Sequence, residues 1–284
     1  MKAYEYILSK QIEYAHNKGI DLIKSKGSRG RPTYTRSLED NLFEPLTTDT
    51  KTFFQNGDGG ELGGDPSKMQ AVHSSSALAV NVFQYWDNIK EVEKIAHACG
   101  FCHSATRISK GISFEVKYSI DEKFQYSPNV DVVINNEPGS KHKVFAVESK
   151  FTEPYSNWEH LGFKAKYLDL DIWEEISHLY KLASSISPKD ERFHHLHAAQ
   201  LIKHILGLKR AFGKTNFRLL YLWYDALGRE GAKHREEIHG FLEVAKSDDI
   251  AIHELSYQEL FARLADNYRI SDKKYIEYIT SRYL

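Results

Sequence analysis

The sequence lacks the features that mark exported and membrane-spanning proteins. Only two cysteines occur among its 284 residues, so a framework of disulfide bonds is excluded. No window approaches the run of about 18 apolar residues that a membrane-spanning helix requires. The segment after Met1 is amphipathic and polar, without the apolar core of a signal peptide. These absences predict a cytoplasmic protein with no membrane partner.

An excess of charge of either sign is also missing. The 38 Lys and Arg residues nearly balance the 39 Asp and Glu residues, which gives a formal net charge of -1. The overall charge therefore does not indicate a nucleic-acid partner, and any surface that binds nucleic acid must be a local patch. With 41% hydrophobic and 27% charged residues, the composition is that of an ordinary globular protein. The length suits one large domain or two small ones.

The spacing of the apolar residues that are present predicts the secondary structure. Alternating or continuous apolar residues predict strands at 112–120, 129–134, 143–151 and 217–225, and the glycine-rich segment 55–67 predicts a loop. Helices are predicted at 3–26, from Ser37 onward, at 69–98, 172–187 and 192–211, and in the tail 233–284, where DIAIHEL suggests one more short strand. This order predicts an α/β domain in which helices wrap a mixed central sheet.

The strand predicted at 143–151 carries two opposite charges on one face. In the segment KVFAVESKF, the two-residue period of a strand places Glu148 and Lys150 on the same side, and the other side is mainly apolar. Taken alone, such a pattern is most often an ion pair on a half-buried sheet, and that alternative stays open.

A hairpin brings a third charged residue to this face. Pro138-Gly139 is a turn signal, and a turn centred there pairs Asp131 near residue 146, within one residue pair of Glu148 and on its face. Two neighbouring carboxylates repel each other, and one takes up a proton unless a cation intervenes. Mg²⁺ is such a cation, because it prefers oxygen ligands. Lys150 beside it can orient or deprotonate a water, or stabilise developing negative charge.

The segments SPNVDVV and VFAVESKF resemble the PD-(D/E)xK nuclease superfamily, which has the restriction-endonuclease-like fold. Asp131 matches the first acidic residue of that motif, Glu148 the second and Lys150 the lysine. The resemblance implies Mg²⁺-dependent cleavage of phosphodiester bonds, with Mn²⁺ able to substitute. Pro128 lies three residues before Asp131 instead of adjacent to it, at a position that varies within the superfamily.

The resemblance covers roughly residues 69–225, whose element order matches the αβββαβ core of the fold. It implies three regions: an N-terminal helical region with a basic arm and a glycine-rich loop at 1–68, the nuclease core at 69–225, and a mostly helical C-terminal extension at 226–284 that packs on the core.

Further site residues follow from the same resemblance. Gln200, in the helix predicted at 192–211, resembles a glutamine that often lies near the metal and the substrate phosphate in this superfamily. The segment 57–83 resembles one found in bacterial restriction-endonuclease-like proteins, and such folds often supply a further acidic residue from this part of the chain. Glu61 is the first candidate for this additional metal ligand and Glu115 the second. All three could instead be ordinary solvated residues.

A basic arm provides candidate contacts to DNA. The segment RGRP at 29–32 matches the core of the AT-hook, in which arginines enter a narrow minor groove. A looser interpretation is an arm that contacts phosphates through Lys24, Arg29 and Arg31, and a solvated loop is the alternative. Ser75 is a further candidate for a phosphate contact, although helix capping explains the serines at 74–76 equally well.

A second candidate metal site lies near the two cysteines. Cys99 and Cys102 could bind zinc together with His97 and His103. The preferred interpretation is a helix end with Gly100 as its cap.

The sequence therefore predicts a Mg²⁺-dependent DNA endonuclease, of a restriction or anti-phage defence type. The alternatives are a DNA-binding protein with an inactive nuclease fold, a DNA repair nuclease, and a zinc or redox protein. Double-stranded DNA is the expected partner, and a homodimer is expected because cutting both strands usually takes two active sites. The recognition sequence, the cut pattern and any dependence on DNA modification lie in loops that the fold does not specify.

Overall fold

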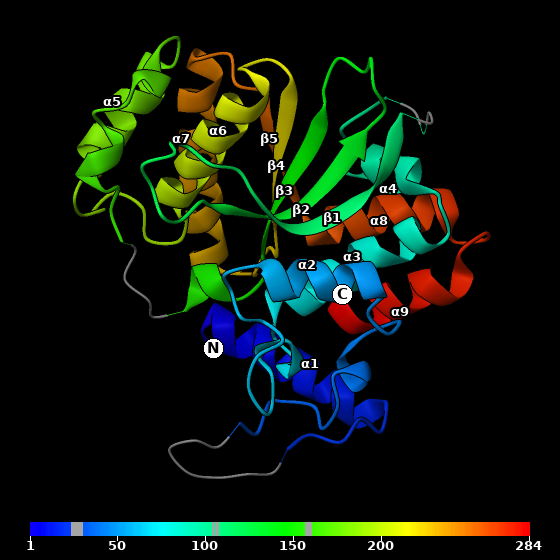
Figure 1. Cartoon of the computed structure of the whole chain (residues 1–284). Coiled ribbons are helices and arrows are strands. Elements are labelled where there is room, and N and C mark those ends of the chain that lie inside the picture. The colour runs from blue at the N-terminus through cyan, green and yellow to red at the C-terminus, as the bar shows by residue number, and fades with distance from the viewer. Residues whose placement is uncertain (24–30, 104, 106–107, 157–160) are drawn as a thin grey trace.

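The computed structural model describes residues 1–23, 31–103, 105, 108–156 and 161–284. Its centre is a five-stranded sheet in the order β1-β2-β3-β4-β5. The strands are β1 (Ser109–Lys117), β2 (Asn129–Asn136), β3 (Val144–Lys150), β4 (Phe217–Trp223) and β5 (Ile252–Ser256). The first three strands pair antiparallel and the last three pair parallel, so β3 belongs to both arrangements (Figure 1). The predicted mixed α/β sheet of restriction-endonuclease-like type is confirmed.

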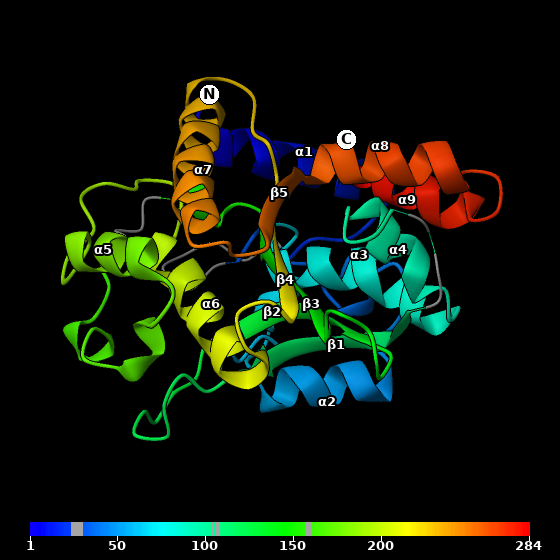
Figure 2. The same cartoon turned by 90° about the horizontal axis from the view of Figure 1, so that it is seen from above.

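Helices cover both faces of the sheet. Seen from above, one side holds α3 (Ser75–Asn88), α4 (Val92–Ala98), α8 (Tyr257–Tyr268) and α9 (Lys273–Tyr283), and the other holds α5 (Ser177–Ser185), α6 (Ala198–Phe212) and α7 (Arg229–Ser247) (Figure 2). Because both faces are covered, every residue of β3 is buried. Two separate hydrophobic cores result, one on each face.

The two ends of the chain meet on one side of the molecule. α1 (Ala3–Asn17) packs against α9, and α2 (Thr48–Asn56) packs against β1. The buried guanidinium of Arg282 donates to the carbonyl of Asn41 at 2.8 Å, and Gln11 donates to the carbonyl of Arg282 at 3.0 Å. Residues of both terminal helices, such as Ala3 and Tyr283, thus belong to the same hydrophobic core as residues of the central sheet.

Several predicted helices are shorter than the sequence pattern indicates. The helix predicted at 3–26 ends at Asn17, since Gly19 takes a left-handed conformation (φ +66) and turns the chain. The helix predicted from Ser37 is only a 3-10 turn, Glu39–Asn41. The helix predicted at 69–98 is two helices, because Lys90 is left-handed (φ 60) between α3 and α4.

The two later helices also begin further along the chain than predicted, at Ser177 and Ala198. The short strand suggested by DIAIHEL is present as β5.

The hairpin register differs from the prediction by two residues. Val133, and not Asp131, pairs with Ala146. The last pair of the hairpin is Val132 with Val147, so Asp131 lies one residue beyond it, across from Glu148. The cause is a loop centred one residue further along than Pro138-Gly139. A shift of two residues leaves every side chain on its predicted face.

None of the helices among the described residues combines the length and the apolar character of a membrane span.

Candidate active site

The acidic residue of β3 is fully buried at the point where the sheet changes from antiparallel to parallel. Glu148 has no exposed surface, and Lys150 is 7% exposed. Lys150 Nζ lies 2.5 Å from one Glu148 oxygen, and Nε2 of His204 lies 2.8 Å from the other. Neither contact has the alignment of a hydrogen bond. Both oxygens of this buried carboxylate are nevertheless in contact with a basic side chain, and such contacts compensate a charge that is removed from water.

Asp131 completes a pair of carboxylates. Its Oδ2 accepts a hydrogen bond from the backbone N–H of Ser149 at 2.7 Å, which holds it against β3. Burial and the charge of Glu148 raise the pKa of Asp131 well above its usual range. Burial also acts to raise the pKa of Glu148, but the positive charge of Lys150 and the contact with His204 outweigh it and lower that pKa to about 2. The two carboxylates thus compete for one nearby cation.

Lys150 is held in its charged form. Burial acts to lower the pKa of Lys150, but the charges of Glu148 and Asp131 reverse this effect, and the net pKa is raised. Its ammonium also donates to Oε1 of Gln200 at 3.1 Å.

Helix α6 brings two polar side chains to the end of β3. Its apolar residues pack in the core shared with β4, which turns Gln200 and His204, one helical turn apart, toward the strand. Gln200 therefore contacts Lys150, while His204 contacts Glu148. In the sequence, His204 follows Gln200 by four residues and therefore lies on the same face of the helix. This spacing is the sequence feature that indicates that His204 lies near the site.

Glu115 and Glu61 lie on the other side of Asp131. Glu115 lies on β1 between two residues that pair with Val132 and Val130, so it lies across from Asp131. The backbone of Glu115 is left-handed (φ 52). Such a backbone costs on the order of 1–3 kcal/mol and is concentrated at functional sites. Burial raises the pKa of Glu115 to about 7, and the charges of Glu61 and Glu148 add to the effect. Burial likewise raises the pKa of Glu61.

These residues border a cleft of about 980 Å³. Asp131, Glu61, Glu115, Gln200 and His204 line it, whereas Glu148 and Lys150 are buried and are not among its lining residues. Over the described part of the chain, no three His, Cys, Asp or Glu side chains form a preformed metal cluster. The donor set nevertheless fits a hard cation such as Mg²⁺, which takes one or two carboxylates and fills its shell with water and phosphate oxygens.

Comparison with known families agrees with this geometry. A family model described as "Restriction Endonuclease associating with ARP" matches residues 6–284. The chain belongs to this family. The predicted resemblance to restriction-endonuclease-like proteins is thereby confirmed, and a nuclease-like or defence role follows at the level of the family. No curated protein and no solved structure matches the chain.

The candidate DNA contacts of this family member fall partly outside the described residues. Lys24 and Arg29 are not described. Arg31 is exposed, and its guanidinium lies over the ring of Tyr34 at 5.0 Å. Ser75 lines the cleft, while its neighbour Ser74 caps α3 by accepting from the N–H of Ala77 at 3.2 Å.

The cysteine pair forms a helix end. Gly100 is left-handed (φ +78) after α4, as expected for a cap, and Cys99 is buried. Burial raises the pKa of the Cys99 thiol, which keeps it protonated and unreactive. No zinc cluster of three or more ligands occurs among the described residues.

Proposed function

We propose that this chain is a Mg²⁺-dependent DNA endonuclease of a restriction or anti-phage defence system. The observation that carries the proposal is the pair of carboxylates, Glu148 fully buried and Asp131 beside it, with the Lys150 ammonium 2.5 Å from Glu148. Two neighbouring carboxylates repel each other and favour a shared cation, and Mg²⁺ takes carboxylate oxygens as ligands.

Asp131 and Glu148 would hold the metal ion. When bound, Mg²⁺ supplies charge stabilisation at the phosphate and lowers the pKa of a bound water. Glu115 is the stronger of the two candidates for a further acidic ligand, because its charge acts directly on Asp131 and Glu148. The charge of Glu61 acts on Glu115, and we assign Glu61 a position further from the proposed metal than Glu115.

Lys150 and Gln200 would orient the attacking water and the phosphate. Lys150 is kept protonated by its carboxylate neighbours, which suits the stabilisation of negative charge at the phosphate. Gln200 fixes the direction of the Lys150 ammonium through its amide oxygen. His204 is a positioning residue that holds the second oxygen of Glu148.

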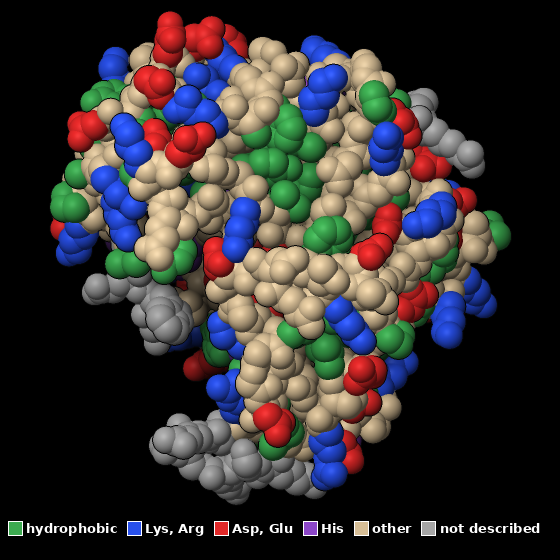
Figure 3. Space-filling model, in the orientation of Figure 1, with side chains coloured by type: hydrophobic (Ala, Val, Ile, Leu, Met, Phe, Trp, Pro, Cys, Tyr) green, Lys and Arg blue, Asp and Glu red, His purple; other side chains and the backbone are tan. Residues whose placement is uncertain are grey.

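Double-stranded DNA is the proposed partner, and two copies of the chain would supply the two active sites that a double-strand cut requires. On the face seen in Figure 3, basic and acidic side chains of the described residues are interspersed, without a large patch of one sign. The phosphate contacts that we propose are Arg31 and Ser75, together with Arg29 and Lys24 of the basic arm.

Cleavage of plasmid and linear DNA tests the proposal. The protein should cut in Mg²⁺ or Mn²⁺ and not in EDTA, and Glu148→Ala or Lys150→Ala should lower the rate by about a thousandfold. Glu122→Ala, at an exposed loop position, is the matched control, and circular dichroism checks that each variant is folded. Cleavage that survives EDTA or either substitution would contradict the proposal. DNA binding without cleavage would favour the alternative of an inactive nuclease fold.

A further inference from the structure

Three ring-bearing side chains that the proposed reaction does not use line one wall of the cleft. Tyr4 comes from α1, Tyr34 from the segment before the 3-10 turn, and His73 from the residue next to the cap of α3. These three residues form what we call the aromatic wall. All three are half-buried, so each side chain keeps a surface open to the cleft.

The aromatic wall is a built arrangement. The His73 ring is nearly perpendicular to both tyrosine rings, at 5.9 Å and 73° from Tyr4 and at 6.4 Å and 87° from Tyr34. Tyr34 forms an antiparallel bridge with Ala71, and the N–H of Val72 donates to the carbonyl of Thr33 at 3.0 Å. Backbone contacts therefore fix the positions of two of the three rings.

The wall adjoins the reaction centre. Thr152, two residues beyond Lys150, donates through its hydroxyl to the carbonyl of His73 at 3.5 Å. Asp131 and the three residues of the wall also line the same cleft, so the wall and the proposed reaction centre border one space.

Charged groups border the aromatic wall. Glu153 acts electrostatically on Tyr4 and His73, and the Arg31 guanidinium lies over the Tyr34 ring at 5.0 Å. Lys203 of α6 also lines the cleft, and its pKa is lowered by burial and by the charge of Lys164. A nucleic-acid strand in the cleft would meet basic groups at Arg31, beside the wall, and at Lys203 of α6.

The wall also offers a polar group that can recognise a base, the Tyr4 hydroxyl, which lies 3.5 Å from Nε2 of His73. Nδ1 of His73 is buried and does not face the cleft. Burial lowers the pKa of His73, which keeps its ring neutral. Aromatic rings with a few polar groups are the usual means of holding a nucleobase outside a duplex.

We propose that the aromatic wall binds an unpaired nucleobase of the substrate, next to the phosphate that is cut. The inference rests on the proposed nuclease function. The cleft volume of about 980 Å³ lies in the range of pockets that take a single small ligand, and an extruded nucleotide is such a ligand. The enzyme would therefore prefer DNA in which a base near the cut is mismatched, bulged or easily flipped.

A binding experiment tests this preference separately from cleavage. Wild-type protein in Ca²⁺ is titrated with a paired duplex and with the same duplex carrying a single bulged 2-aminopurine. We expect tighter binding of the bulged duplex and a change in 2-aminopurine fluorescence on binding. Tyr34→Leu should weaken binding of the bulged duplex by about tenfold, since base–aromatic stacking contributes about 1–3 kcal/mol, and should leave the paired duplex unaffected.

Two further variants keep the test informative. Tyr34→Phe retains the ring and should bind the bulged duplex nearly as wild type does. Tyr180→Leu, on the exposed side of α5, is the matched control and should change nothing. Equal affinity of the wild type for both duplexes, or an equal loss for both with Tyr34→Leu, would overturn the inference. Absence of metal-dependent cleavage together with an intact preference for the bulge would overturn only the proposed function.

Discussion

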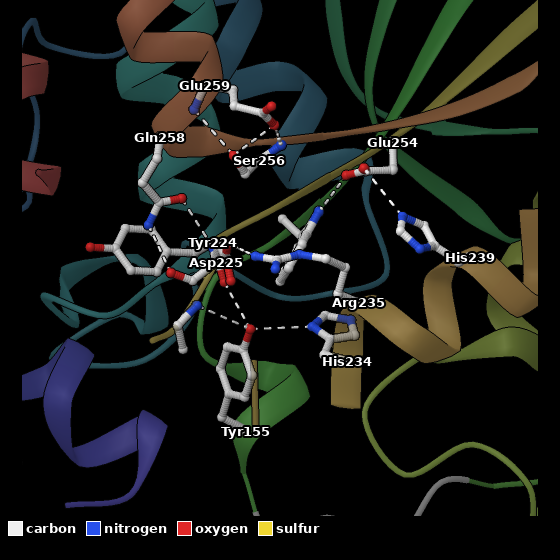
Figure 4. Close-up of polar contacts among 12 residues, drawn as sticks. Tyr155, Tyr224, Asp225, His234, Arg235, His239, Glu254, Ser256, Gln258 and Glu259 are labelled. Atoms are coloured by element: carbon white, nitrogen blue, oxygen red, sulfur yellow. Dashed lines mark hydrogen bonds and ion pairs between the residues drawn. The ribbon is translucent and has the colours of Figure 1, made fainter. Parts of the chain in front are cut away.

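Two polar clusters lie at the ends of neighbouring parallel strands, and they differ in how well they are satisfied. At the end of β4, Tyr155 donates to the carbonyl of Tyr224 at 2.9 Å and lies 3.2 Å from Nδ1 of His234 (Figure 4). Nε2 of His234 in turn lies 2.9 Å from the Tyr221 hydroxyl. At the end of β3, Glu148 is buried to the same degree, yet neither of its oxygens has an aligned partner.

The same network continues at the start of α7 and α8. Gln258 exchanges two hydrogen bonds with the backbone of Asp225, at 3.0 and 3.1 Å, and the Asp225 carboxylate pairs with Arg235 (Figure 4). A cluster in which each central group has a partner fixes the position of the strand end and leaves nothing for a ligand. In the cluster on β3, Glu148 and Asp131 both act on the ammonium of Lys150, and this pair of carboxylates is the one with capacity for a further cation.

The largest expected effect comes from replacing Lys150, whose ammonium group now compensates the charge of Glu148. Lys150→Met should lower the free energy of unfolding by about 3–5 kcal/mol in EDTA, because it leaves a buried charge unpaired. Mg²⁺ should restore more stability to this variant than it adds to the wild type, since the metal replaces the lost charge. Urea denaturation with and without Mg²⁺ measures both. Equal effects of Mg²⁺ on the two proteins would show that the cluster does not bind the ion.

A smaller effect is expected at the contact that holds Glu148 from α6. His204→Leu should weaken Mg²⁺ binding by about 10- to 100-fold, as is typical when a group that orients a ligand is removed. Cleavage measured against Mg²⁺ concentration should recover at saturation. His239→Leu, an exposed histidine near Glu254 and away from β3, is the control. A loss that persists at saturating Mg²⁺ would argue against an orienting role.

The satisfied cluster should respond in the opposite way. Tyr221→Phe removes the partner of His234 Nε2 and should lower the free energy of unfolding by about 1.5 kcal/mol, whatever the Mg²⁺ concentration. Cleavage by the folded variant should be unchanged. Rescue of its stability by Mg²⁺ would remove the distinction between the two clusters.

The smallest effect depends on pH. The pKa of Glu115 is about 7 in the folded protein, against its usual 4.5. Between these values the folded chain binds more protons than the unfolded chain, so the contribution of Glu115 to stability is full below about 4.5 and is lost as pH rises through about 7.

Glu115→Gln should therefore be more stable than the wild type by about 1 kcal/mol at pH 8 and equal to it at pH 4.5, allowing for solvent screening. Thermal denaturation across this pH range measures the difference, and Glu122→Gln is the exposed control. A constant difference at every pH would mean that Glu115 is not the titrating group.

Much of the sheet and part of the site could be predicted from local patterns. The strands at 129–134 and 143–151 lie within two residues of β2 and β3, and Glu148 and Lys150 do share one environment at the end of β3. Gln200 on α6 accepts a hydrogen bond from Lys150, and its role beside a metal and a phosphate stays a prediction. Helix ends were less predictable, because left-handed residues such as Lys90 break a pattern that continues in sequence.

The sequence alone determined which side chains share a face, because the two-residue period of a strand is local and survives a register shift of two. Tertiary structure alone decided which distant groups meet. The contact of His204 with Glu148, the left-handed backbone of Glu115 opposite Asp131, and the assembly of the aromatic wall from three separate segments all depend on packing between elements far apart in the chain. Local periodicity carries no record of such contacts, since it specifies directions along one element and not distances between elements.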